Sequence, residues 1–323
     1  MQIKKEKQEM GTPKKKGART VHIFDDVFRT MCEKMPKLLI PLINEAFGTS
    51  YDEDDELEQL RNERHLDGSM IITDALVKIR EHLYHIECQS TDSDCMILRM
   101  FEYDTAIAIE HWREIPDGYE ILFPRACVVY LRGEDKAYRN KKLHVRFPNG
   151  EVYIYNVKVI EVQKYSRNEL FKKKLLMFLP YYILRYERNL PLKRDKIRFQ
   201  TIIKEYEDIM NSLEGVLPYD QEGYKRRLIE LIDRISKYVT RKKLSLRKGL
   251  GDIMGGRVLK LETDKIIAES LAQGISQGIS QGISQGIMQE KNDTFERVTR
   301  NYMKLDPSLS REEAEEKAKA ILS

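Results

Sequence analysis

The chain has 323 residues, 33% of them charged, and 56 Lys and Arg against 52 Asp and Glu give a formal net charge of +4. This balance excludes a uniformly basic protein, so any affinity for nucleic acid must come from local patches. No apolar run approaches the roughly 20 residues of a membrane-spanning helix, and Cys32, Cys88, Cys95 and Cys127 show no C-X-X-C spacing. The composition predicts a cytoplasmic protein with no membrane span and with reduced cysteines.

The N-terminal region begins with residues 1–20, which are rich in Lys and Gly and predict a disordered basic arm. A helix is predicted from Asp26 to Phe47, because leucines and isoleucines recur there at helical spacing. Gly48 fits the C-cap of this helix. The acidic run 52–56 is interpreted as a hydrated loop.

Two apolar runs, 71–79 and 83–89, alternate as β-strands do, and a polar turn separates them. Alternation places Asp74 on one face of the first run, and it places Glu87 and Gln89 on one face of the second. An antiparallel hairpin would therefore bring the carboxylates of Asp74 and Glu87 side by side.

Paired carboxylates suit a divalent cation. Mg²⁺ prefers oxygen ligands and usually takes one or two carboxylates, leaving its other positions to water and substrate phosphate. Asp74 and Glu87 meet this requirement for Mg²⁺, or for Mn²⁺ in its place, and Gln89 could orient the attacking water. Such an ion supplies what phosphodiester hydrolysis needs. Glu33 or Glu45 of the first helix could add a third carboxylate, with ordinary surface acids as the simpler interpretation.

Two other candidate sites are interpreted as structural. His82 and His85 lack companion Cys or His residues at zinc-ligand spacing, so a satisfied or exposed histidine is the better explanation of each. A second Glu-X-Gln, Glu161-Val162-Gln163, has no Asp at a comparable distance upstream. It is interpreted as part of the edge of the last strand.

After the hairpin, residues 96–113 have helical periodicity and end near a turn signal at 116–118. Arg99 and Tyr103 lie one turn apart on this helix and could face the site or a nucleic-acid backbone, although packing explains Tyr103 equally well. Strands are predicted over 121–131 and in a hairpin around Asn149-Gly150, a dipeptide that favours a type I′ turn.

The C-terminal half is predicted to be helical from 168 to 247, with many basic residues that could hold DNA phosphates or simply face solvent. Residues 273–287 repeat Gln-Gly-Ile-Ser. On a helix the isoleucines would drift by about 40° per repeat, and each Gly costs roughly 1 kcal/mol relative to Ala. Such a helix needs a partner, so a homo-oligomer is one interpretation and a flexible linker is the other. Ser310–Glu313 has the pattern of a capping box.

The order and spacing of these features resemble the PD-(D/E)XK nuclease superfamily, specifically its Rpn-like branch of recombination-promoting nucleases and transposases. The resemblance covers most of the chain and is carried by residues 25–29, 86–89, 161–166 and 178–187 together with Asp74, Arg99 and Tyr103. It implies an α/β fold with a restriction-endonuclease-like core (α-β-β-β-α-β, a mixed sheet flanked by helices) and a C-terminal helical extension. It also implies metal-dependent DNA cleavage, with Arg29 and Arg99 as DNA contacts.

The sequence departs from the superfamily pattern at two positions. Gln89 stands where most members carry Lys, and an amide cannot supply the positive charge of an ammonium. The similar branch commonly carries Gln here. Thr73 precedes Asp74 where a proline is usual, which alters the local turn but not the ligand.

These features divide the chain into a basic arm (1–20), a nuclease core (21–166), a basic helical extension (167–250), a linker with the repeats (251–292) and a helical hairpin (293–323). The leading hypothesis is a Mg²⁺-dependent DNA endonuclease active in recombination or transposition. The alternative is a DNA-binding or assembly protein on a nuclease fold with little or no activity. No residue distinguishes DNA from RNA as the substrate.

Overall fold

The structure is a computed structural model that describes residues 23–66, 69–90, 95–132, 142–192, 194–217 and 223–322. The predicted basic arm, 1–20, lies outside these residues. Contacts divide the chain into two compact units, Met1–Val258 and Leu259–Ser323. The predicted boundaries within the first unit stay predictions.

The first unit is built on a five-stranded mixed sheet of order β1-β4-β5-β8-β11. β1 (Leu57–Gln59), β4 (Ala75–Ile79) and β5 (His82–Gln89) pair antiparallel. β8 (Arg125–Tyr130) runs parallel to β5, and β11 (Lys158–Glu161) runs parallel to β8. β8 is buried over nearly its whole length, which requires cover on both faces.

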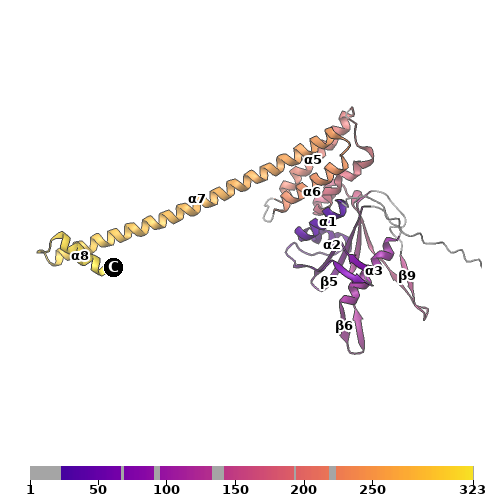
Figure 1. Cartoon of the computed structure of the whole chain (residues 1–323), viewed down its shortest axis with the longest axis horizontal. Helices are drawn as coiled ribbons and strands as arrows, with labels where there is room; N and C mark the ends of the chain where they lie inside the picture. The colour runs from indigo at the N-terminus through magenta and orange to yellow at the C-terminus, as the bar shows by residue number, and fades with distance from the viewer. Residues whose placement is uncertain are drawn as a thin grey trace, which may run out of the picture. The chain divides into compact units, whose positions relative to one another are not determined.

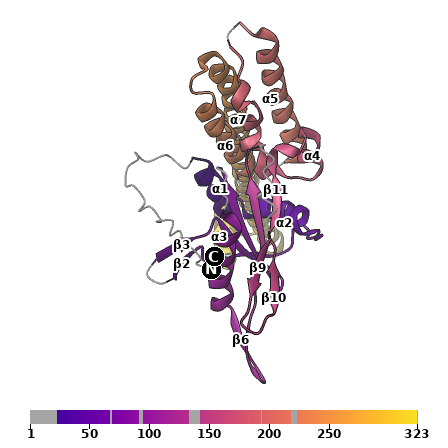
Figure 2. The same cartoon turned by 90° about the vertical axis from the view of Figure 1, so that its right-hand side faces the viewer.

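Helices cover the two faces of this sheet. α3 (Met96–Glu110) packs through Met96 and Met100 against Ala126 and Val128 of β8. α2 (Leu39–Phe47) lies on the reverse, where the Phe47 ring contacts Tyr84 at 5.1 Å between centroids. Figure 2 shows the strands between these two helices. The predicted mixed sheet flanked by helices is therefore confirmed.

The first predicted helix, from Asp26 to Phe47, is wrong as a single element. It is divided into α1 (Ile23–Lys34), a short 3₁₀ helix (Pro36–Leu38) and α2. Pro36 causes the division, because proline lacks the N–H of an α-helical hydrogen bond and its ring clashes with the preceding turn. The predicted C-cap is confirmed, since Gly48 has φ +67° and its N–H donates to the Asn44 carbonyl at 2.9 Å.

Three two-stranded hairpins accompany the central sheet (Figure 1). They are β2–β3 (Glu63–Leu66 with Ser69–Ile72), β6–β7 (Trp112–Ile115 with Gly118–Ile121) and β9–β10 (Leu143–Arg146 with Val152–Tyr155). The helix predicted over 96–113 therefore ends early, because residues 112–115 pair across the turn that was predicted at 116–118. The strand region predicted over 121–131 contains the last residue of β7 and the whole of β8.

The turn between β9 and β10 was predicted at the right place but with the wrong type. A type I′ turn needs positive φ at both central residues. Here Gly150 has φ +90° and Asn149 is not in that region. Pro148 explains the difference, because its ring fixes φ at a negative value in the position where the Phe147 carbonyl accepts from Gly150 at 3.0 Å.

The segment after β11 is helical over most of its length, as predicted. It contains α4 (Arg167–Lys172), a 3₁₀ helix labelled η4 (Leu176–Asn189), α5 (Lys196–Val216) and α6 (Tyr224–Val239). η4 is buried from Leu176 to Leu184, and α6 packs on both η4 and α1. These helices therefore belong to the same compact unit as the sheet.

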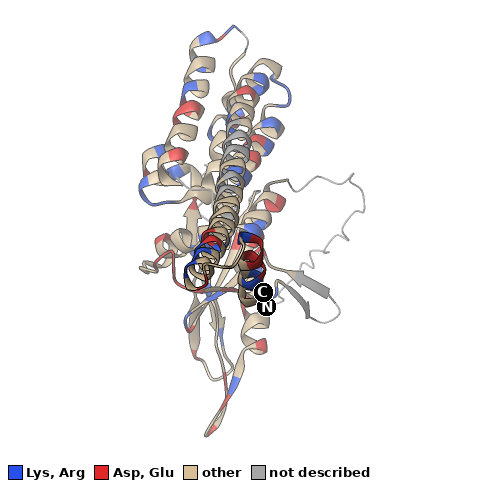
Figure 3. Cartoon of the chain, turned by 90° about the vertical axis from the view of Figure 1, so that its left-hand side faces the viewer, with Lys and Arg blue, Asp and Glu red and all other residues tan. Residues whose placement is uncertain are grey.

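α7 (Leu244–Leu305) carries the Gln-Gly-Ile-Ser repeats as continuous helix, which contradicts the flexible-linker interpretation (Figure 1). Residues 271–289 have no charged side chain (Figure 3). The four isoleucines of the repeats are 52–58% exposed. Self-association through them stays a prediction.

The chain ends in α8 (Arg311–Leu322), which folds back on the end of α7. Ala314 and Ala318 of α8 are buried, as is Thr299 of α7. The predicted capping box is confirmed, because Glu313 N–H donates to Ser310 Oγ at 3.3 Å and Ser310 N–H donates to Glu313 Oε2 at 2.9 Å. In the described part of the chain no helix is both long and apolar enough to cross a bilayer.

The cysteines are free thiols. Cys32, Cys88 and Cys127 are buried in the core of the first unit, as predicted, and Cys95 is exposed.

Candidate functional site

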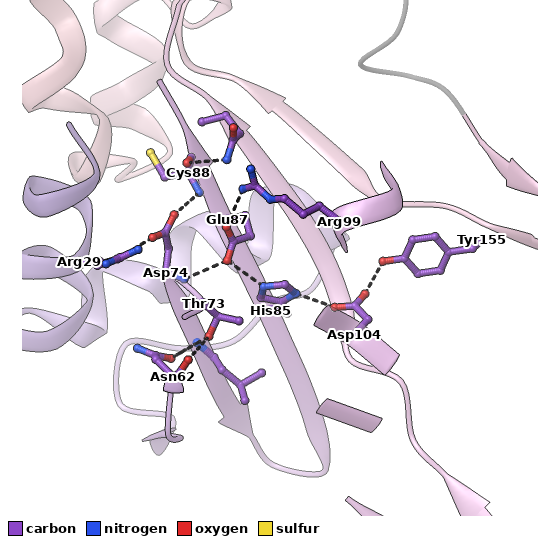
Figure 4. A network of polar contacts seen from close by, with 12 residues as sticks. Arg29, Asn62, Thr73, Asp74, His85, Glu87, Cys88, Arg99, Asp104 and Tyr155 are labelled. Atoms are coloured by element: carbon purple, nitrogen blue, oxygen red, sulfur yellow. Dashed lines mark hydrogen bonds and ion pairs between the residues drawn. The ribbon is translucent and has the colours of Figure 1, made fainter. Parts of the chain in front are cut away.

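The β4–β5 hairpin brings Asp74 and Glu87 together. Its register pairs Ala75 with Ile86, so the residue before β4 lies opposite Glu87. Asp74 N–H donates to Glu87 Oε1 at 3.0 Å, and Cys88 N–H donates to Asp74 Oδ2 at 2.9 Å (Figure 4). Asp74 is 4% exposed and Glu87 is 3% exposed. Two carboxylates therefore share one buried position at the end of the central strands.

The strand that was predicted over 71–79 is interrupted immediately before this pair. β3 ends at Ile72 and β4 begins at Ala75. Asn62 holds the break, because its carbonyl accepts from Thr73 N–H at 3.0 Å and its side-chain oxygen accepts from Leu76 N–H at 3.1 Å. The break leaves the Asp74 N–H directed at the Glu87 carboxylate instead of at a neighbouring backbone carbonyl.

A buried network extends from Glu87 through His85 to α3. His85 Nε2 lies 3.1 Å from Glu87 Oε1, and His85 Nδ1 lies 2.6 Å from Asp104 Oδ1. Tyr155 donates its hydroxyl to the other Asp104 oxygen (Figure 4). Burial alone would lower the pKa of His85, but the hydrogen bonds to Asp104 and Glu87 outweigh it and raise the pKa to about 9. The imidazolium therefore donates to both carboxylates at neutral pH.

His85 is hydrogen-bonded through both ring nitrogens and His82 is exposed, which agrees with the prediction of satisfied or exposed histidines. Sequence reasoning missed Asp104, which lies 19 residues from His85. Its signal was an aspartate at helical spacing from the apolar residues Met100, Ile107 and Ala108, on the face that the helix buries. Such a residue needs a buried partner.

The electrostatics of the pair favour a bound cation. Burial, followed by the neighbouring Glu87 carboxylate, raises the pKa of Asp74 to about 7. The Cys88 N–H and Arg29 oppose that shift. Two adjacent carboxylates in a desolvated position repel each other, and a divalent cation between them would relieve the repulsion.

Three arginines surround the two acids. Arg29 Nε donates to Asp74 Oδ1 at 2.8 Å, and an Arg99 terminal nitrogen lies 3.6 Å from Glu87 Oε2. Arg132 is bonded instead to Glu187 at the cavity wall. Arg29 and Arg99 were predicted as DNA contacts, and the structure places both against the acids themselves.

These side chains line a cavity of about 510 Å³ whose walls come from α1, β5, α3 and α6. Gln89 lines the cavity as well, and its Nε2 donates to the Cys88 carbonyl at 3.2 Å. A larger cavity of about 820 Å³ lies beside β9–β10. Its lining is mainly aromatic and aliphatic and brings no pair of acids together, so the smaller cavity is the candidate site.

The first helix contributes Asp25 to this cavity rather than either predicted acid. Glu45 accepts hydrogen bonds from Tyr165 and Lys173 at a separate place, and Glu33 is not among the residues lining the cavity. Neither residue lines the cavity, so the simpler interpretation of Glu33 and Glu45 as ordinary acids outside the site agrees with the structure. The sequence did indicate Asp25, because it lies one helical turn before Arg29 and therefore on the same face of the helix.

The donor atoms fit a cation that takes few protein ligands. In the described residues no group of three or more His, Cys, Asp or Glu side chains is arranged to hold a metal ion. Asp74 and Glu87 supply two carboxylates, which suffices for Mg²⁺ or Mn²⁺ when water and a phosphate complete the shell. The hydrogen bonds of Glu87 among the described residues go to Oε1, and Oε2 has an ion pair with Arg99 at 3.6 Å, so Oε2 retains lone pairs for a metal.

Comparison with family models, with curated proteins and with solved structures gave no match. The chemistry of the site is therefore argued from its own geometry.

Proposed function

We propose that this chain is a PD-(D/E)XK-type nuclease that hydrolyses DNA phosphodiester bonds with Mg²⁺ or Mn²⁺. One observation carries the proposal: Asp74 and Glu87 lie opposite each other, buried, on the wall of a cavity that also contains arginines. Burying two like charges side by side destabilises a fold unless a partner compensates them. Arg29 and His85 offset part of this charge, and a divalent cation held by both carboxylates would offset it further. Recombination or transposition is the setting that the family resemblance implies.

The roles of the side chains follow from their positions. Asp74 and Glu87 would hold the ion, which supplies a water of lowered pKa and polarises the phosphate when bound. The Gln89 side-chain oxygen has no partner in the described part of the chain, because the amide uses only its Nε2, so that oxygen can accept from a water and orient it. Arg29 and Arg99 bring positive charge to a cavity that must accept a polyanion.

The test is conversion of supercoiled plasmid to open circles by the full chain in Mg²⁺ or Mn²⁺, with EDTA as the control. Asp74→Ala should abolish the conversion, because it removes one of two carboxylates. The Asp74 side chain accepts from Cys88 N–H and Arg29, so circular dichroism must show that the variant folds. Undiminished cutting by folded Asp74→Ala would refute the site.

A second candidate function is DNA binding without turnover. Two observations favour this function. Arg29 Nε already donates to Asp74 Oδ1 at 2.8 Å, and Gln89 stands where most members of the superfamily that the chain resembles carry Lys. A protein of this kind would retard DNA in a gel equally in EDTA and in Mg²⁺ and would leave it intact. Metal-dependent loss of supercoiled plasmid would exclude this function.

A further inference from the structure

The proposed nuclease site lacks one positive charge. Phosphoryl transfer concentrates negative charge on the non-bridging oxygens, and Gln89 stands where most members of the superfamily that the chain resembles carry Lys. The Gln89 amide is neutral, and its Nε2 already donates to the Cys88 carbonyl at 3.2 Å. If the chain cuts DNA, another side chain must supply this charge.

The three arginines that line the cavity differ in how their N–H donors are used. Arg132 makes two hydrogen bonds to Glu187, at 2.8 and 3.1 Å, and one to the Ser90 carbonyl. Arg29 donates its Nε to Asp74 at 2.8 Å. Both guanidinium groups are therefore held by acceptors of the protein.

Arg99 is the exception among these three. Its Nε is buried and has no hydrogen-bond partner among the described residues. Its terminal nitrogen lies 3.6 Å from Glu87 Oε2, which is an ion pair but too long for a hydrogen bond. A buried guanidinium N–H without an acceptor is unusual in a folded protein, and the Arg99 side chain, which is 40% exposed, lines the cavity that holds the two acids.

The position of Arg99 on α3 suits a phosphate contact. The residue lies in the first turn of the helix and extends toward Glu87 (Figure 4). One turn later, the Tyr103 ring lies 5.8 Å from the guanidinium carbon. A cation–π contact holds the group in place without using its N–H donors, so the planar fork remains available for two oxygens of one phosphate.

We propose that Arg99 supplies the positive charge that Gln89 cannot, by binding the non-bridging oxygens of the scissile phosphate beside Glu87. This role rests on the proposed nuclease function. In the hydrolysis, the oxygen of one water bonds to phosphorus as one P–O ester bond breaks. One water proton ends on the leaving hydroxyl and the other on the new phosphate monoester. Arg99 offsets the charge that builds up on the non-bridging oxygens between these states.

The experiment measures kcat and KM for an oligonucleotide duplex with the full chain in Mg²⁺. Arg99→Gln should lower kcat about 100-fold, the loss typical of one such donor, and Arg99→Lys should retain part of the rate. Adding Gln89→Lys to Arg99→Gln should restore at least a tenth of the wild-type kcat. The matched control is Arg113→Gln, an exposed arginine paired with Glu120 on a distant hairpin, which should leave kcat unchanged.

A second readout separates a charge role from a structural one. Calorimetric affinity for Mn²⁺ alone should be equal or tighter in Arg99→Gln, because a positive charge beside Glu87 is removed. Weaker Mn²⁺ binding, together with a loss that Gln89→Lys does not rescue, would overturn the inference in favour of a packing role. Full activity of Arg99→Gln would overturn it and leave the nuclease proposal intact. Absence of cutting by the wild type in every metal would overturn both.

Discussion

Two Glu-X-Gln sequences lie at the same end of one sheet and have different surroundings. Glu87-Cys88-Gln89 ends β5, and Glu161-Val162-Gln163 follows from the end of β11. Both strands run parallel to β8, and both Gln89 and Glu161 are in register with Tyr130. The tripeptide pattern and the strand direction are therefore the same, while Glu161 lies two residues further along the sheet than Glu87.

Their neighbours differ. β5 has β4 beside it, and the residue before β4 places a second carboxylate against Glu87 at a buried position. β11 is the last strand of the sheet, and Glu161 contacts Lys164. The Gln163 amide is used structurally, because it donates to the carbonyls of Leu131 and Tyr181 at 2.8 and 3.1 Å. The comparison teaches that the tripeptide alone does not form a two-carboxylate site, and that the second carboxylate comes from the neighbouring strand.

The largest expected effect is on catalysis. Glu87→Gln should slow Mg²⁺-dependent plasmid nicking by about 1,000-fold, because it removes a metal ligand while keeping the side-chain size. Glu161→Gln is the matched control on the other tripeptide and should nick at the wild-type rate. Equal losses in the two variants, measured by gel densitometry over time, would contradict the difference drawn between the strands.

The next effect is on metal affinity. His85→Gln removes the imidazolium that orients Glu87, and loss of such a supporting group typically weakens metal binding by about 10- to 100-fold. Mn²⁺ calorimetry on the full chain would measure the change. Asp104→Asn, one step further along the network, should show a smaller loss of the same kind. Unchanged Mn²⁺ affinity in folded His85→Gln would show that the network only packs the core.

The smallest effect concerns the free energy of unfolding. Gln163→Ala leaves the carbonyls of Leu131 and Tyr181 without this donor and should destabilise the fold by about 1–3 kcal/mol. Its nicking rate should remain normal. Gln89→Ala should do the reverse. Its nicking should be slower than that of the wild type, and its free energy of unfolding should lie within about 0.5 kcal/mol of the wild-type value. Urea denaturation measures the free energy of unfolding of both variants. A loss of stability in Gln89→Ala would show that Gln89 has a structural role instead.

Sequence alone predicts the part of the site that depends on local periodicity. Alternation in two short runs was enough to place Asp74 opposite Glu87. The break at Thr73 was missed because Asn62, from a separate segment, holds it. The contact of His85 with Asp104 was missed for the same reason, since it joins a strand to a helix.

The fold shows the same limit. Helical spacing predicted α1 and α2 but did not weigh Pro36, whose missing N–H divides them. Trp112 and Arg113 extended the helical periodicity of the preceding residues, and only the pairing of 112–115 with 118–121 makes them part of a strand. On the first helix, the sequence could not show that Asp25 rather than Glu33 or Glu45 lines the cavity, because tertiary packing decides which face of a helix is turned to the site.

The most direct test of the central claim is an anomalous difference map from crystals of the full chain soaked in Mn²⁺. The account predicts one peak within about 2.3 Å of both the Asp74 and Glu87 carboxylates, and no peak at Glu161. A peak elsewhere, or none between these two acids in crystals of protein that still nicks plasmid, would contradict it.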